Sequence, residues 1–212
     1  MSDPIPLEPG KYYHIYNRGN NRENIFNERR NYAHFLKLYA FHIGPIADTY
    51  AYCLLRNHFH LFVRVEDLTG FPTSGEVSEG KRSSATDDDL SGLLPSQAFS
   101  NFFNAYAKAF NKAYHRTGAL FQRPFGRIEV TSEGYLFRLV TYIHQNPQRH
   151  GFVADFREWP YSSYHTLLSE KATHLKRQDV LEWFGGRNSL IAMHEQVFPE
   201  NLIAVLAPDD FD

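Results

Sequence analysis

Residues 49–65 decide the fold, and they read Thr49-Tyr-Ala-Tyr-Cys-Leu-Leu55, then Arg56-Asn57, then His58-Phe-His-Leu-Phe-Val-Arg-Val65. Both flanking runs are rich in β-branched and aromatic residues, which are typical of strands. Only two residues separate the runs, so the simplest structure for them is an antiparallel hairpin. The stretch therefore predicts two paired strands, at residues 49–55 and 58–65.

The segments around this hairpin predict helices packed on the same sheet. Residues 11–17 and 125–131 have the composition of strands, whereas residues 28–43, 96–114 and 132–146 place apolar side chains at helical spacing. The resulting order is strand, helix, strand, strand, helix, strand, helix. This order indicates an α+β fold with helices packed on a mainly antiparallel sheet. Two further short helices are expected in the tail of the chain.

The composition limits the classes of protein to which the chain can belong. It has 212 residues, of which 42% are apolar, so it can bury an ordinary core. Its single cysteine excludes a disulfide scaffold and a Cys-rich metal module. No apolar run approaches the ~20 residues that span a bilayer. The first residues lack the basic start and apolar run of a secretory signal, so we expect a cytoplasmic protein with no membrane partner.

The net charge of −2 conceals a basic body with two acidic segments. Residues 66–90 and residues 195–212 each carry a net charge of −5, so the remainder carries +8. A basic body suits a polyanionic partner such as nucleic acid, although many ordinary proteins share this imbalance. Residues 66–95 are rich in Gly, Ser, Thr, Pro and acids, and we interpret them as a mobile surface insertion.

The pair His58 and His60 is the sharpest chemical signal in the chain. Alternate side chains of a strand share one face, so the two imidazoles are expected to project together, about 7 Å apart at the backbone. From there they can converge on one metal ion. Phe59 and Phe62 are expected to face elsewhere, into the core. Two polar residues on a solvent-facing strand would explain the pattern equally well, and unrelated metalloenzymes share it.

The predicted helix 132–146 presents a second chemical signal beside its apolar stripe. Tyr142 lies one turn after Arg138 and one turn before Asn146, and Pro147 is expected to end the helix there. A tyrosine in such a helix is most often a packing residue. A phenol has a pKa of about 10, but adjacent positive charge favours the phenolate. Together with a metal ion that polarises a phosphoryl oxygen, it could attack phosphorus.

Five segments follow one another in an order that resembles a known family: Tyr13-His-Ile-Tyr-Asn-Arg-Gly-Asn-Asn21, Arg56-Asn-His-Phe-His-Leu61, Gly118-Ala-Leu-Phe-Gln122, Tyr142-Ile-His-Gln-Asn-Pro147 and Trp159-Pro-Tyr-Ser-Ser163. Together they resemble the single-tyrosine, His-hydrophobe-His (HUH) transposases, most closely the REP-associated tyrosine transposases. The resemblance covers roughly residues 11–165. It implies a ferredoxin-like HUH nuclease fold in residues 1–165, interrupted by the acidic insertion at 66–95. Residues 166–212 would form a helical, acidic extension.

This resemblance also implies an activity and its residues. Such enzymes cut single-stranded DNA beside a hairpin, leave a 5′-phosphotyrosine and a free 3′-hydroxyl, and rejoin the strand by reversing the reaction. The nucleophile would be Tyr142, and the metal ligands would be His58, His60 and Asn146, with Mg²⁺ or Mn²⁺ as the ion. Imidazole ligands alone would equally suit zinc. The phosphotyrosine conserves the bond energy, so no nucleotide cofactor is expected, which agrees with the lack of a Walker-type loop.

Basic side chains are the expected contacts to DNA, and the candidates are Arg18, Arg22, Lys108, Lys112, Arg116, Arg123, Arg127 and Arg138. Each could equally be a solvated surface charge, and Arg138 could pair with a nearby carboxylate. Two other functions compete with the transposase hypothesis. One is a hairpin DNA-binding protein of the same fold that no longer cuts, and the other is a metal phosphoesterase that uses water. The sequence leaves open whether the protein is a monomer or a homodimer.

Overall fold

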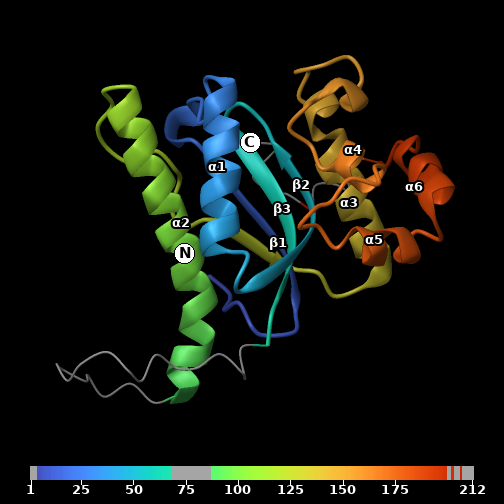
Figure 1. Ribbon diagram of the computed structural model, residues 1–212, viewed down its shortest axis with the longest axis horizontal. Coiled ribbons are helices and arrows are strands. Elements are labelled where there is room, and N and C mark those ends of the chain that lie inside the picture. Colours follow the sequence, from blue (N-terminus) through green and yellow to red (C-terminus); the bar gives the residue numbers. More distant parts are fainter. Residues whose placement is uncertain (1–3, 68–86, 200–201, 203–205, 207–212) are drawn as a thin grey trace.

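The computed structural model describes residues 4–67, 87–199, 202 and 206. The elements, shown in Figure 1, are β1 (Tyr12–Arg18), η1 (Asn20–Arg22), α1 (Arg29–His42), β2 (Ala47–Leu54), β3 (His58–Val65), α2 (Asp87–Ala113), β4 (Gly126–Glu129), α3 (Glu133–Arg149), η2 (Phe156–Glu158), α4 (Tyr164–Leu167), α5 (Arg177–Trp183) and α6 (Arg187–His194). From β1 to α3 the strands and main helices follow the predicted order, but the tail holds three short helices, α4, α5 and α6, where two were predicted. Among the helices of these described segments, none is long and apolar enough to cross a membrane.

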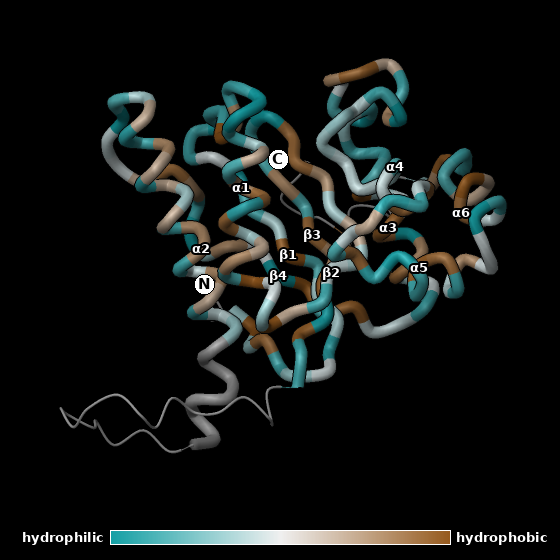
Figure 2. Tube along the Cα trace, in the orientation of Figure 1, coloured by the Kyte–Doolittle hydropathy of each residue, from teal (hydrophilic) through white to brown (hydrophobic). Residues whose placement is uncertain are grey.

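The strands form one sheet in the order β2-β3-β1-β4, and each neighbouring pair is antiparallel. Helices α1 and α2 cover one face of this sheet, and α3 covers the other face together with the short C-terminal helices (Figure 1). Two clusters of buried apolar side chains lie between these layers. In Figure 2 the strands and the sheet-facing parts of the helices carry much of the hydrophobic colour. The predicted α+β fold, with helices packed on an antiparallel sheet, is therefore confirmed.

The strict alternation of β3 corrects one prediction about its side chains. Phe59 packs in the cluster beneath α1 and α2, whereas Phe62 packs in the cluster beneath α3. Even-numbered positions of β3 share one face, so Phe62 lies on the same face as His58 and His60. The prediction that Phe62 faces away from the histidines was therefore wrong, although the side chain is buried as expected.

Helix α2 is longer than the sequence indicated. It begins at Asp87, within the predicted insertion, and Pro95 lies inside it. Residues 68–86 of the predicted insertion lie outside the described residues, as does most of the acidic tail.

The loop that follows α3 is fastened to the edge strand β2. The indole Nε1 of Trp159 donates to the Leu54 carbonyl at 2.9 Å. The Ser163 backbone N–H donates to the Tyr52 carbonyl at 2.9 Å, and the Tyr52 N–H donates to Ser163 Oγ at 2.8 Å. These bonds pair backbone groups at the outer edge of β2 and hold the segment that follows α3 against the sheet.

Candidate active site

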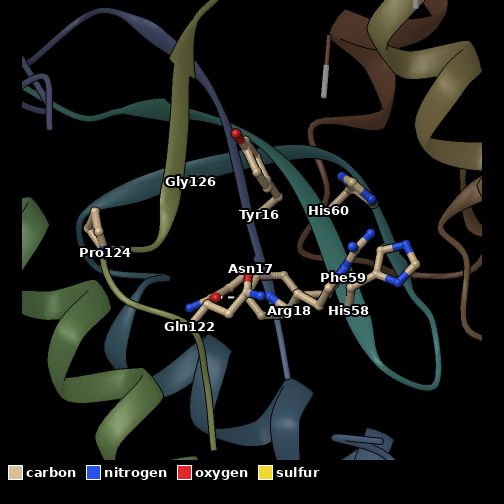
Figure 3. A pocket seen from close by; sticks show the side chains of 9 residues that line it. All are labelled: Tyr16, Asn17, Arg18, His58, Phe59, His60, Gln122, Pro124 and Gly126. Atoms are coloured by element: carbon tan, nitrogen blue, oxygen red, sulfur yellow. Dashed lines mark hydrogen bonds between the residues drawn. The ribbon is translucent and has the colours of Figure 1, made fainter. Parts of the chain in front are cut away.

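Strand β3 places the two predicted histidines at one end of the sheet. The imidazoles of His58 and His60 project from the same side of the strand, as Figure 3 shows. Their ring centroids lie 5.2 Å apart, and the rings are nearly perpendicular. In the adjacent strand β1, Arg18 lies opposite His58 and Tyr16 lies opposite His60. The expected common orientation of the two histidines is therefore present in the structure.

Helix α3 brings Tyr142 and Asn146 to these histidines. The Oδ1 atom of Asn146 lies 3.2 Å from Nε2 of His58, and the Tyr142 ring packs edge-on against the His60 ring at 5.5 Å. The helix begins after Ser132, whose hydroxyl caps it by accepting a hydrogen bond from a backbone N–H of the first turn. It continues past Pro147, contrary to the prediction, because a proline so close to the end removes little of the helix's hydrogen bonding.

Three of these side chains, His58, His60 and Asn146, offer donors that fit a divalent metal ion. Among the described residues, no cluster of three or more His, Cys, Asp or Glu side chains could hold one. The candidate set is instead two imidazoles and a carboxamide oxygen. Two ligands at ~2.1 Å from one ion and at right angles to each other are ~3.0 Å apart, close to the 3.2 Å between His58 Nε2 and Asn146 Oδ1.

The hydrogen bonding of His58 also suits a metal ligand. Its Nδ1 lies 2.7 Å from Oδ1 of Asn57, so Nδ1 carries the proton and a neutral ring keeps its lone pair on Nε2. That lone pair faces the Asn146 oxygen. The buried Nδ2 of Asn146 has no hydrogen-bond partner in the part of the chain that the structure describes. Two electron pairs that face each other are stabilised by a cation between them.

Several neighbours of this centre were not singled out by the sequence. Nδ1 of His60 lies 2.9 Å from Nε2 of His14, and the His150 ring lies 4.8 Å from the His58 ring. Tyr16 packs against His14 with 4.9 Å between ring centroids. Its ring lies over Gly126 of β4, where any Cβ atom would overlap it. The alternation of β1 predicts that His14 and Tyr16 share a face, but only the strand order shows that this face meets His60.

The centre is enclosed in this conformation. His60 and Asn146 are fully buried, and Tyr142 and His58 are 1% and 3% exposed. A small pocket of about 20 Å³ opens beside the two histidines, as Figure 3 shows. A larger groove of about 720 Å³ runs between α2 and the segment 118–125. The two cavities share three lining residues, which are Asn17, Gln122 and Pro124.

The predicted DNA-contact residues divide into three groups. Arg18 lines the small pocket, and Lys108, Arg123 and Arg127 line the groove. Arg22 and Lys112 are exposed and lie outside both cavities. The third group is Arg116 and Arg138. Arg116 forms an ion pair with Glu23, to which its Nε donates at 2.9 Å. Arg138 is half-buried on α3 and has no carboxylate partner among the described residues.

Arg127 is the most unusual of these cations. Its guanidinium lies 3.8 Å from the centre of the Phe125 ring, and its Nη1 donates to Ser96 Oγ at 2.9 Å. Its buried Nε has no hydrogen-bond partner among the described residues, and burial lowers its pKa. Arg127 has no ion-pair partner in the described part of the chain, and a partly desolvated guanidinium of this kind suits a phosphate ligand, which it can bind through two nitrogens.

A chain of buried histidines fixes the rotation of α3. His144 lies between Tyr142 and Asn146 in sequence, and its Nε2 contacts Ser163 Oγ at 2.7 Å. Its Nδ1 contacts Nε2 of His194 at 2.7 Å, and Nδ1 of His194 donates to the carbonyl of Leu190. Burial lowers the pKa of His194 to about 4 and holds the pKa of His144 well below its usual range, so both rings are neutral near pH 7.

The fold and the site define a class of protein: an antiparallel sheet in which two histidines of a central strand face a tyrosine-bearing helix. No family model matches the chain. It is 26% identical over 118 residues to the "Putative REP-associated tyrosine transposase" of Haemophilus influenzae. The match covers 56% of this chain and 59% of that relative, so it spans less than two thirds of the relative's length.

A solved structure supports the same resemblance at the level of the fold. It is described as "Structure of the REP associates tyrosine transposase bound to a REP hairpin", and it matches with a TM-score of 0.52 and 18% identity. The alignment covers 80% of this chain and 86% of that chain. The resemblance to the REP-associated tyrosine transposases that the five segments predicted is therefore confirmed, and the chain has the fold of that transposase.

Proposed function

We propose that this chain is a REP-associated tyrosine transposase, which cuts single-stranded DNA beside a hairpin and rejoins it through a phosphotyrosine at Tyr142. The observation that supports this best is the convergence of His58 and His60 with Tyr142 and Asn146, which come from β3 and from α3. A protein that only bound DNA would not need two imidazoles, an amide and a phenol together in a buried centre. The similarity to the Haemophilus influenzae relative agrees with the proposal.

The proposed reaction is a phosphoryl transfer from the 3′-oxygen of the DNA strand to the phenol oxygen of Tyr142. A divalent ion such as Mg²⁺ or Mn²⁺, held by His58, His60 and Asn146, would polarise a phosphoryl oxygen of the bound strand. The oxygen of Tyr142 forms a bond to phosphorus as the phosphorus–3′-oxygen bond breaks. The phenol loses its proton, and the departing oxygen takes up a proton to become the 3′-hydroxyl. Attack by a 3′-hydroxyl on the phosphotyrosine reverses these steps and releases Tyr142.

The groove beside the centre is the proposed path of the single strand. Lys108, Arg123 and Arg127 contribute three positive charges to it, and none of the described residues that line it is acidic. It meets the pocket of His58 and His60 at Gln122 and Pro124. A strand held by its phosphates along such a groove is led to the histidines, and binding of this kind is weakened by salt.

One observation favours the second candidate, a hairpin-binding protein that no longer cuts. Tyr142 and Asn146 are 1% and 0% exposed, so a phosphate reaches them only if the surrounding side chains move. A protein that never opened this centre would bind DNA and leave it intact. A third candidate, a phosphoesterase that uses water, needs the same ligands but not Tyr142. The three candidates therefore differ in what the phenol does.

A covalent-trapping experiment separates these candidates. The protein is incubated with labelled single-stranded hairpin oligonucleotides from the DNA that flanks its gene, with Mg²⁺ or Mn²⁺. Tyr142→Phe is the test variant, and Tyr135→Phe is the matched control, because Tyr135 is another buried tyrosine of α3 whose pKa burial raises to about 12. We expect a denaturant-resistant protein–DNA band in the wild type and the control, and none in Tyr142→Phe or with EDTA.

Each other result contradicts the proposal in a specific way. Hairpin binding without a covalent band, with both metals, would support the protein that does not cut. Cleavage that survives in Tyr142→Phe would support the phosphoesterase. A band that is lost in Tyr135→Phe and kept in Tyr142→Phe would identify Tyr135, and not Tyr142, as the nucleophile.

A further inference from the structure

His14 connects the candidate centre to the C-terminal region of the chain. It lies on β1, is fully buried, and shares the sheet face of His60. Its Nε2 atom lies 2.9 Å from Nδ1 of His60, and its Nδ1 atom lies 2.8 Å from the backbone carbonyl of Leu206. The planes of the two imidazole rings are inclined by only 23°, and their centroids lie 5.1 Å apart. His14 thus has polar partners on both sides.

These contacts determine which nitrogen of each neutral ring carries the proton. The Leu206 carbonyl can only accept, so Nδ1 of His14 donates to it. Nε2 of His14 is then the acceptor, and Nδ1 of His60 must donate to it. The remaining lone pair of His60 is therefore on Nε2. Asn57 imposes the same arrangement on His58, so both rings carry their lone pair on Nε2.

We infer that His14 is a positioning residue, which holds His60 in the tautomer and orientation that bind a divalent metal ion through Nε2. This inference rests on the proposed function, because it assigns His60 as a metal ligand. Histidines that bind metals are commonly held by a hydrogen bond from the other ring nitrogen. A buried imidazole is costly unless it forms such bonds. An apolar ring would fill the same space, but it could not accept the proton of His60.

Two substitutions at one position separate the hydrogen bond from the packing. His14→Phe keeps a ring of similar size and removes the acceptor. His14→Gln keeps an amide oxygen that can accept from Nδ1 of His60. The matched control is His34→Phe, which removes an exposed histidine of α1. Circular dichroism establishes that each variant is folded before metal binding is measured.

The first measurement is the binding of Mn²⁺ to the protein without DNA. Electron paramagnetic resonance monitors this binding through the loss of the free-ion signal. We expect the dissociation constant to rise roughly 10- to 100-fold in His14→Phe, which is the usual effect of losing such a supporting bond. His14→Gln is expected to recover most of the affinity, and His34→Phe to match the wild type. Equal affinity in His14→Phe and the wild type would overturn the inference.

Nitrogen-15 chemical shifts of the imidazoles give a second, independent measurement on the metal-free wild type. We expect His60 to carry its proton on Nδ1, coupled through hydrogen bonding to His14. A proton on Nε2 of His60 would overturn the inference, even if every variant failed to fold. If the wild type bound no Mn²⁺ but His60 kept the expected tautomer, the metal-dependent mechanism would fail while the positioning by His14 stood. The two failures are therefore distinguishable.

Discussion

Lowering the pH from 7 to 5 is expected to destabilise this fold by about 2 kcal/mol through His194 alone. His194, the last residue of α6, is buried, and its Nε2 accepts a hydrogen bond from His144 of α3. Burial lowers its pKa from 6.5 to about 4. In the unfolded chain its pKa returns to the ordinary value. The unfolded state therefore binds a proton at pH 5 that the folded state does not.

The sign and the size follow from this difference in proton binding. A depressed histidine pKa costs little once the pH is well above 6.5, where the ring is neutral in both the folded and the unfolded state. The free energy of unfolding falls by up to ~1.4 kcal/mol per pH unit as the pH drops from 6.5 towards the folded pKa of about 4. Between pH 7 and pH 5 the loss amounts to about 2 kcal/mol, a large share of the stability of a typical domain.

Denaturant unfolding at pH 7 and at pH 5 measures this loss, with His194→Gln as the variant. A glutamine oxygen can accept the hydrogen bond from His144 and does not titrate, so the variant should lose about 2 kcal/mol less than the wild type over this interval. Titrating groups that do not contact residue 194 cancel in the comparison, whereas His144 does not, because His194 contributes to the lowering of its pKa. The exposed His34 provides the control variant His34→Gln, which should follow the wild type. Parallel losses in the wild type and His194→Gln would refute the reasoning.

Three further substitutions test individual contacts of the site. Asn146→Ala should weaken Mn²⁺ binding by roughly 10-fold or more, whereas Asn146→Asp should retain it, because a carboxylate also supplies an oxygen donor. Titration calorimetry measures both, and equal Mn²⁺ binding by Asn146→Ala and the wild type would exclude this residue as a ligand. Gly126→Ala should displace the Tyr16 ring, since a Cβ atom would overlap it, and an unchanged Tyr16 ring in a crystal structure would contradict this. Arg127→Met should lower the affinity for single-stranded DNA and reduce the slope of log affinity against log salt concentration by about 0.7. The control Lys112→Met, which lies outside the groove, should change neither quantity. Fluorescence anisotropy at several salt concentrations measures both variants.

Local rules were enough for the strands, the helices and the orientation of His58 and His60. The period of two along β3 placed both imidazoles on one face, and the same rule applied consistently also places Phe62 there. Side chains on helix α3 were assigned faces by their spacing. The boundaries were less accurate, because Asp87 starts α2 early and Pro147 does not end α3.

The contacts between distant segments could not be derived from spacing. His58 and Asn146 are 88 positions apart, and their 3.2 Å contact depends on how α3 crosses the sheet. Their convergence was expected only from the resemblance to a family. His14 was overlooked because its role depends on the order of the strands and on Leu206, which approaches from the far end of the chain. Charge patterns likewise could not show that Arg116 is paired with Glu23.

The most direct test of the central claim is to locate the covalent bond to DNA. After trapping and nuclease digestion, cleavage with trypsin should yield residues 139–149, Leu-Val-Thr-Tyr-Ile-His-Gln-Asn-Pro-Gln-Arg, in which Tyr142 is the only tyrosine. The account predicts that tandem mass spectrometry finds a nucleotide phosphate on Tyr142 in this peptide. A nucleotide on any other tyrosine, or cleaved DNA with no modified peptide, would contradict it.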